Sequence, residues 1–241
     1  MMVPVTHILM WRAGMRIRVL RQKNPSSKPY WQEFPYDGNN DQTIAGMLEE
    51  LNYLDDLKDI SGNSAPRIQW EQSCLQGMCG ACAMVINNIP ALACETFLRD
   101  IKKDTVVLEP LRKFPVITDL IVDRSVIDTY LKKEGAFIEE YKGAPHSEYD
   151  HMYQAGKCLK CGLCLEVCPN YSDGRSFYGA AFANDCYLIS TRSGTRDIAL
   201  TKAYREHFER GCSKSLSCAD ICPMKIPTLA SISKMNRVRK S

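Results

Sequence analysis

Four cysteines lie within eleven residues of this chain, and their spacing constrains the fold more than any other feature. They are Cys158, Cys161, Cys164 and Cys168, separated by two, two and three residues, and Pro169 follows the last. This spacing is typical of bacterial-type iron–sulfur ferredoxins, in which the fourth cysteine of a run binds a different cluster from the first three. The run therefore predicts a second segment that completes this cluster and builds another one around Cys168.

A second segment of this kind lies further along the chain and ends in Cys222-Pro223. Ser215 stands where the first run has its second cysteine. The three remaining thiolates of the second site suit a [3Fe–4S] cluster, and a serine alkoxide ligand is the disfavoured alternative because it is harder and more basic than thiolate. The crossed arrangement predicts Cys158, Cys161, Cys164 and Cys222 as ligands of a [4Fe–4S] cluster, and Cys168, Cys212 and Cys218 as ligands of a [3Fe–4S] cluster.

A third group of cysteines precedes these runs. It starts with a loop of C-x4-C-x2-C spacing that contains Gly77 and Gly80, and a distant cysteine completes it. This is the plant-type [2Fe–2S] pattern. Glycine adopts the unusual dihedrals that such a loop needs, and backbone N–H groups aimed at sulfur help to set the potential. The predicted [2Fe–2S] ligands are Cys74, Cys79, Cys82 and Cys94.

The first half of the chain has the pattern of a small α+β domain. Alternating polar and apolar residues predict strands over 16–21 and 30–34, and further strands are expected over 83–86, 89–93 and 105–108. A turn at Asn87-Asn88 would join two of them. A helix capped by Asp41 or Thr43 is predicted between, and its apolar face consists of Ile44, Met47, Leu48 and Leu51.

The second half is predicted to be mostly helical, with helices over 118–133, 184–190 and 198–209. The expected fold is therefore α+β: a plant-type [2Fe–2S] ferredoxin (β-grasp) domain followed by a mostly α-helical bacterial-type two-cluster ferredoxin domain. The predicted boundaries are an extension over 1–14, a first domain over 15–110 and a second domain over 111–241.

Composition supports metal binding over other uses of cysteine. The chain has 241 residues, 12 of them cysteine, and a net charge of +3, which is too small to indicate nucleic-acid binding. No secretory signal and no membrane-spanning apolar stretch are expected. Clustered cysteines in such a chain indicate metal rather than disulfides. No nucleophile, acid–base pair or phosphate-binding loop suggests a substrate site.

Structural zinc is the alternative for both cysteine regions. Zinc is satisfied by four ligands and gives no reason for a triple run followed by proline. Cys186 fits no spacing and is expected to be an ordinary buried thiol. His207 lies five residues before Cys212, and a plain helix histidine is the expected interpretation.

These three motifs in this order resemble the iron–sulfur subunit of the succinate dehydrogenase/fumarate reductase family (complex II). The similarity includes the stretch KPYWQE at 28–33, LEPL at 108–111 and all eleven ligand positions. It implies electron transfer between FAD, bound covalently to a flavoprotein subunit, and quinone or haem b in a membrane-anchor cytochrome b subunit. It also implies a peripheral membrane protein on the cytoplasmic face of the bacterial inner membrane, with no substrate site of its own. Both succinate oxidation and fumarate reduction fall within the family.

The resemblance implies that the [2Fe–2S] cluster faces the flavin, the [4Fe–4S] cluster lies midway and the [3Fe–4S] cluster faces the membrane. Members that bind quinone at this subunit carry a tryptophan after the first Cys-Pro, whereas Asn170, Tyr171, Ser172 and Asp173 follow here. Quinone-site residues are therefore not carried over, and electrons are expected to pass to haem in the anchor. An iron–sulfur subunit of another flavin-dependent reductase or dehydrogenase complex is the alternative, although such subunits usually have two complete cysteine runs.

Replacing Ser215 by Cys is expected to convert the [3Fe–4S] site into a [4Fe–4S] site of lower potential. The new thiolate would be a soft ligand for a fourth iron at the cluster corner that has no cysteine in the native chain. Electron paramagnetic resonance (EPR) of the purified complex measures the change. An unchanged [3Fe–4S] signal in this variant would show that more than ligand number shapes the corner.

Overall fold

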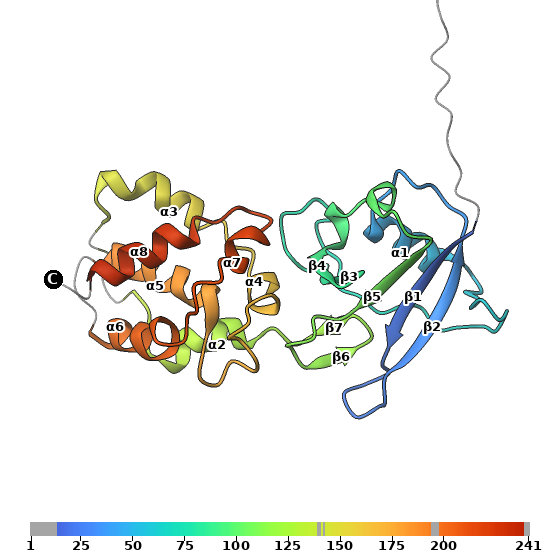
Figure 1. Ribbon diagram of the computed structural model, residues 1–241, viewed down its shortest axis with the longest axis horizontal. Coiled ribbons are helices and arrows are strands. Elements are labelled where there is room, and N and C mark those ends of the chain that lie inside the picture. Colours follow the sequence, from blue (N-terminus) through green and yellow to red (C-terminus); the bar gives the residue numbers. More distant parts are fainter. Residues whose placement is uncertain (1–13, 139–140, 142, 194–197, 239–241) are drawn as a thin grey trace, which may run out of the picture.

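The computed structural model describes residues 14–138, 141, 143–193 and 198–238, so all but the last residue of the predicted extension lies outside the described part. A sheet forms one part of the molecule and helices form the other (Figure 1), and the predicted mixed α+β class is confirmed. The strands are β1 (Met15–Arg21), β2 (Tyr30–Tyr36), β3 (Ala83–Ile86), β4 (Ile89–Leu92), β5 (Thr105–Glu109), β6 (Val116–Thr118) and β7 (Ile121–Val122). The helices are α1 (Ile44–Tyr53), α2 (Val126–Lys133), α3 (Tyr149–Ala155), α4 (Leu163–Glu166), α5 (Gly179–Ser193), α6 (Ile198–Tyr204), α7 (Ser217–Asp220) and α8 (Thr228–Val238), with short helical turns η1 (Ala93–Glu95), η2 (Leu98–Asp100), η3 (His146–Glu148) and η4 (Arg205–Glu209).

The main sheet has five strands in the order β2-β1-β5-β3-β4. Strand β1 pairs antiparallel with β2 and parallel with β5. Ile17 and Val19 on β1 are fully buried, as expected for a strand with alternating apolar residues. All five predicted strands are confirmed, with small shifts at their ends.

Helix α1 covers the sheet through the predicted apolar face. Ile44, Met47, Leu48 and Leu51 are all buried. Thr43, one of the two predicted caps, is the N-cap, and its side chain accepts a hydrogen bond from the Gly46 N–H at 3.2 Å. This bond satisfies one of the backbone donors that the first turn leaves free.

The predicted turn between β3 and β4 is also confirmed. Asn87 and Asn88 have φ of 49° and 70°, the left-handed values that a two-residue hairpin turn requires. Asn87 is bonded to the neighbouring strand through both its backbone and its side chain: its N–H donates to the Val107 carbonyl and its Oδ1 accepts from the Val107 N–H, both at 2.8 Å. The hairpin is therefore fixed to β5 as well as closed on itself.

The helix predicted over 118–133 is wrong in its first part. Residues 116–122 form the β6–β7 hairpin, and α2 begins only at Val126. Asp119 has a φ of 42° at the hairpin turn, a value that is incompatible with an α-helix. Its carboxylate bonds to distant backbone N–H groups, so tertiary contacts override a local pattern that Leu120 and Ile121 fit equally well as strand residues.

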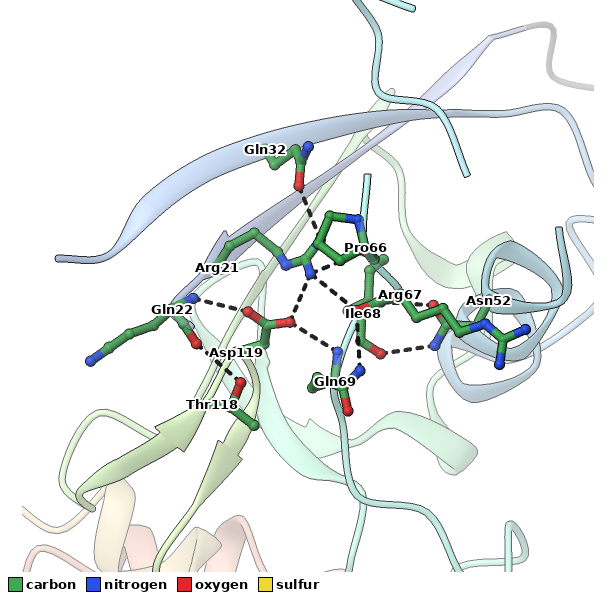
Figure 2. Close-up of polar contacts among 10 residues, drawn as sticks. All are labelled: Arg21, Gln22, Gln32, Asn52, Pro66, Arg67, Ile68, Gln69, Thr118 and Asp119. Carbon is green, nitrogen blue, oxygen red and sulfur yellow. Dashed lines mark hydrogen bonds and ion pairs between the residues drawn. The ribbon is translucent and has the colours of Figure 1, made fainter. Parts of the chain in front are cut away.

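A buried ion pair joins this hairpin to β1. The Arg21 Nη2 lies 2.9 Å from the Asp119 Oδ2, and the two side chains are only 3% and 4% exposed. Arg21 also donates hydrogen bonds to the Gln32 side chain and to the carbonyls of Pro66 and Arg67, as Figure 2 shows. The guanidinium thus exchanges water for carboxylate and carbonyl oxygens on three different segments.

The carboxylate of Asp119 has backbone partners of its own. Its Oδ1 accepts from the Gln22 N–H at 2.9 Å, and its Oδ2 accepts from the Gln69 N–H at 3.0 Å (Figure 2). A buried carboxylate needs such donors in addition to its counter-ion, because losing water otherwise costs several kcal/mol. The ion pair therefore holds together the end of β1, the segment that precedes the first cysteine loop, and the hairpin that leads to the helical part.

Helix α5 forms the centre of the helical part and is buried along most of its length. It packs against α2, α4, α6 and α8. The helix predicted over 184–190 is confirmed, although it starts earlier, at Gly179. The helix predicted over 198–209 is confirmed over Ile198–Tyr204, after which a π-helical turn follows. Among the described residues, no helix is long and apolar enough to span a bilayer.

Replacing Asp119 by Ala is expected to lower the free energy of unfolding by about 3–5 kcal/mol, because the change leaves the buried Arg21 without its counter-ion. Chemical denaturation followed by circular dichroism measures the loss. Asp41 is the matched control, since its ion pair with Arg99 is more than half exposed on both sides and is expected to contribute at most about 1 kcal/mol. Equal losses in the two variants would contradict the importance of the buried pair.

Candidate functional site

The β3–β4 hairpin brings two predicted ligands together. Cys82 directly precedes β3, and Cys94 lies in the η1 turn directly after β4. Their sulfur atoms are 3.3 Å apart, and the Ala93 N–H donates to the Cys82 carbonyl at 3.1 Å. The pairing of the two strands is thus continued into the ligand residues themselves.

The loop before β3 directs backbone N–H groups at sulfur. The Cys74 sulfur accepts from the N–H groups of Gln76 at 3.5 Å and Met78 at 3.3 Å. The Cys94 sulfur accepts from the Gly77 N–H at 3.2 Å. These bonds require the left-handed backbone conformation of Leu75 and Gly77, whose φ values are 54° and 70°.

The protonation of these thiols follows from the same contacts. The pKa of the Cys74 thiol is lowered to about 7, first by the Gln76 N–H and then by a hydrogen bond with the Cys79 thiol. Burial raises the pKa of Cys94 to about 12, and the hydrogen bond with Cys82 adds to the rise. Metal binding requires thiolates, so it would release these protons.

Four thiols are thus arranged as two pairs: Cys74 with Cys79, and Cys82 with Cys94. A [2Fe–2S] cluster fits this arrangement, because each tetrahedral iron takes two thiolates and shares two sulfides with the other. Cys82 and Cys94 are buried, and Cys74 and Cys79 are partly exposed.

The first cysteine run turns its thiols inward by the same means. Lys160 and Gly162 have φ of 54° and 86°, and α4 starts directly after Gly162. The N–H of Lys160 reaches the Cys158 sulfur and lowers its pKa, but burial outweighs this bond and raises the pKa overall. Burial likewise raises the pKa of Cys161 to about 11.

Cys222 from the second segment joins this group. Its charge would repel those of Cys158, Cys161 and Cys164, and each of these repulsions adds to the rise in pKa that burial causes. Such repulsion is strongest over short distances, so Cys222 lies near these three thiols. Cys164 is repelled by Cys218 as well, so the two cysteine segments adjoin each other at this point.

The remaining three thiols form a second group beside it. Burial raises the pKa of Cys218, and repulsion from Cys168 and then Cys212 adds to the rise. These three cysteines line a cavity of about 400 Å³ together with Ser215. The Ser215 hydroxyl accepts a hydrogen bond from Ser217 at 3.4 Å. A cavity bounded by three thiols and one hydroxyl fits a cluster with one iron corner missing.

The thiols are not arranged around a single point. Among the described residues, no three His, Cys, Asp or Glu side chains converge as ligands of one metal ion. Structural zinc needs four such ligands around one point. A cluster does not need them, because each of its irons takes one or two protein ligands and completes its shell with sulfide.

Comparisons with known proteins agree with the thiol geometry. Residues 16–129 match the family model described as a 2Fe-2S iron-sulfur cluster binding domain. The succinate dehydrogenase iron-sulfur subunit of Bacillus subtilis is 33% identical over 236 residues, which cover 92% of this chain and 91% of that protein. The chain belongs to the family of succinate dehydrogenase and fumarate reductase iron–sulfur subunits. The resemblance predicted from the three cysteine groups is thereby confirmed, and with it membership of an oxidoreductase.

Other members of the succinate dehydrogenase/fumarate reductase family cover the chain equally well. The fumarate reductase iron-sulfur subunit of Escherichia coli is 28% identical over 91% of this chain and 90% of its own length. A chain of the Mycobacterium smegmatis Sdh1 complex in the apo form superposes with a TM-score of 0.75 and 21% identity, and covers 95% of this chain and 96% of that one. This structural likeness supports the fold.

Two residues outside the family's cysteine motifs are placed as expected. Cys186 is completely buried in α5. The His207 ring stacks on Tyr178 at 4.1 Å, and its Nδ1 lies 3.0 Å from the Ser176 carbonyl. The second contact indicates that Nδ1 carries a proton.

Polar residues that no local sequence pattern indicates hold the first run in place. The Lys113 N–H donates to the buried Glu166 side chain at 3.1 Å, and the Lys113 ammonium reaches the Cys168 carbonyl. Lys160, inside the run, pairs with Asp185 on α5, and burial nevertheless raises the pKa of that carboxyl. These partners lie 25 to 55 residues apart, so no local pattern could have identified them.

Replacing Gly77 by Ala is expected to reduce the amount of [2Fe–2S] cluster by more than half. The positive φ of Gly77 costs a non-glycine residue roughly 1–2 kcal/mol, and relieving this strain would move the N–H that donates to the Cys94 sulfur at 3.2 Å. Visible absorption and EPR of the purified complex measure the loss. Gly62→Ala is the matched control, because Gly62 has a similar φ of +81° and no atom near its added Cβ. A similar loss of cluster in the control would show that general strain is responsible.

Proposed function

We propose that this chain is the electron-transfer subunit of a membrane-bound quinol:fumarate reductase or succinate:quinone oxidoreductase. It would relay electrons between FAD in a flavoprotein subunit and quinone or haem b in a membrane anchor. One observation carries the proposal: the two cysteine segments adjoin each other, because Cys168 lines one cavity with Cys212 and Cys218, and Cys222 is near enough to repel the Cys158 thiolate. Two neighbouring clusters require this exchange of ligands, whereas two independent metal sites would not.

Eleven cysteines would hold three clusters under this proposal. Such clusters carry one electron each, at potentials set by ligand number, N–H···S bonds, burial and net charge. The cysteine-containing loops of this chain would set the number of ligands, the N–H···S bonds, the burial and the local charge of each cluster. The proposed ligands are Cys74, Cys79, Cys82 and Cys94 for [2Fe–2S], Cys158, Cys161, Cys164 and Cys222 for [4Fe–4S], and Cys168, Cys212 and Cys218 for [3Fe–4S].

The partners and the location follow from family membership and are part of the proposal. The [2Fe–2S] site would face the covalently bound FAD of the flavoprotein, where the dicarboxylate chemistry takes place. The [3Fe–4S] site would face the membrane-anchor cytochrome b, and the whole subunit would lie on the cytoplasmic face of the inner membrane.

The proposed domain boundary at residue 110 follows directly after β5, the last strand of the main sheet. The β6–β7 hairpin beyond this boundary packs back onto the first domain through Asp119. We therefore propose that the hairpin connects the two ferredoxin-like units rigidly and is not a flexible linker.

Single-cysteine variants of the purified complex test the proposed ligand sets. Cys222→Ala is expected to abolish the [4Fe–4S] EPR signal, although its neighbour in sequence, Cys218, belongs to the other site. Cys168→Ala is expected to abolish the [3Fe–4S] signal, although it lies in the first run. Cys186→Ala serves as control and is expected to leave all three signals intact.

Metal analysis tests the proposal as a whole. The intact complex is expected to contain about nine irons and ten acid-labile sulfides per chain, as the three cluster formulae require. Zinc without acid-labile sulfide would overturn the proposed function. Loss of the [3Fe–4S] signal in Cys222→Ala, with [4Fe–4S] retained, would overturn the crossed arrangement alone.

A further inference from the structure

Arg124 connects the first two cysteine groups. It lies between β7 and α2, and its side chain is only 16% exposed. Its guanidinium donates hydrogen bonds to the carbonyls of Gly80 at 2.8 Å, Ala81 at 3.3 Å and Cys161 at 3.3 Å. The remaining polar partner is the carboxylate of Glu71, whose side chain is 38% exposed.

The two loops that Arg124 joins are in direct contact. A Cβ added to Gly80 would lie 2.7 Å from the Cys161 Cβ and 3.0 Å from the Leu159 Cβ, and Gly80 has a φ of +76°. Any other residue would therefore be strained and would push the loops apart. A side-chain-free position at this contact permits the closest approach of a [2Fe–2S] ligand loop to a [4Fe–4S] ligand.

We propose that electrons cross between the first and second cysteine groups where Gly80 meets Cys161, and that Arg124 is the positioning residue of this crossing. Arg124 holds the two loops together and raises the reduction potentials of both centres. The inference rests on the proposed function, because it assumes clusters on both groups. The inference assigns to Arg124, which is not a cluster ligand, control over electron transfer between the first and second cysteine groups.

Charge explains why Arg124 affects the potentials. One electron crosses with no bond made or broken and no proton taken up, so the accepting centre gains a full negative charge and the donor loses one. A nearby cation stabilises the reduced form of each centre, and the effect is strong in a buried site of low dielectric. The guanidinium stays charged at any working pH. The carboxylate of Glu71 weakens this field without breaking the bonds of Arg124 to the three carbonyls.

Two substitutions with opposite expected effects test the role of the charge. Arg124→Gln is expected to lower the reduction equilibrium constants of the [2Fe–2S] and [4Fe–4S] centres about tenfold, which is about 59 mV for one electron. Glu71→Gln is expected to raise both constants by about twofold to threefold. EPR-monitored redox titration of the purified complex gives both values, and the [3Fe–4S] centre serves as the internal reference.

Further variants separate charge from general structure. Arg124→Lys keeps the charge and is expected to restore most of the potential. Arg18→Gln is the matched control, because Arg18 is 42% exposed, pairs with Glu33 on the neighbouring strand β2 and is expected to shift neither centre. Unchanged potentials in Arg124→Gln, or an equal shift of all three centres, would overturn the role of Arg124. If that variant fails to assemble, the absence of a rise in Glu71→Gln overturns it.

Gly80→Ala tests the crossing point itself. The added methyl group is expected to weaken the magnetic interaction between the [2Fe–2S] and [4Fe–4S] centres, seen as slower spin relaxation in the molecules that retain both clusters. Unchanged relaxation with the full cluster content would place the crossing elsewhere. Absence of clusters from the unmodified complex would contradict the proposed function itself, so the two failures are distinguishable.

Discussion

Thiols that repel one another when ionised must lie within a few ångströms of each other, and the rest of this structure depends on that requirement. Burial raises the pKa of Cys161 and Cys218 in the helical part, which shows how unfavourable their charges are without metal. The protein offsets this cost with backbone N–H groups aimed at sulfur and with loops in left-handed conformations. Ligand loops of this kind have little stability of their own, so the surrounding elements have to hold them in shape.

Different structural elements hold each cysteine-containing loop in its conformation. The first is closed by the β3–β4 hairpin, which delivers Cys82 and Cys94 to one place. The cysteine runs of the helical part pack against α5, α7 and α8, and charged residues such as Lys113 and Lys160 tie the first run to the remainder of the fold. The ammonium groups of Lys113 and Lys160 each pair with an oxygen atom there, as a region of low dielectric requires.

Particular side-chain contacts also fix the connection between the sheet part and the helical part. The Arg21–Asp119 pair fixes the β6–β7 hairpin to the sheet, and Arg124 follows the hairpin after one further residue, Asp123. Anchoring the hairpin therefore also positions the guanidinium that contacts Gly80 and Cys161. A buried ion pair and a short hairpin therefore determine how closely the first two cysteine groups approach each other.

The amino-acid sequence by itself determined the three cysteine groups, the strands of the first part, the cap and apolar face of α1, and the Asn87-Asn88 turn. These features depend on neighbours a few residues away, so spacing and periodicity are sufficient to reveal them. Only the tertiary structure decided that residues 116–122 form a hairpin, that Arg21 pairs with Asp119 across 98 positions, and that Gly80 touches Cys161. Those contacts join segments far apart along the chain, and their energies come from burial and charge pairing that no local pattern encodes.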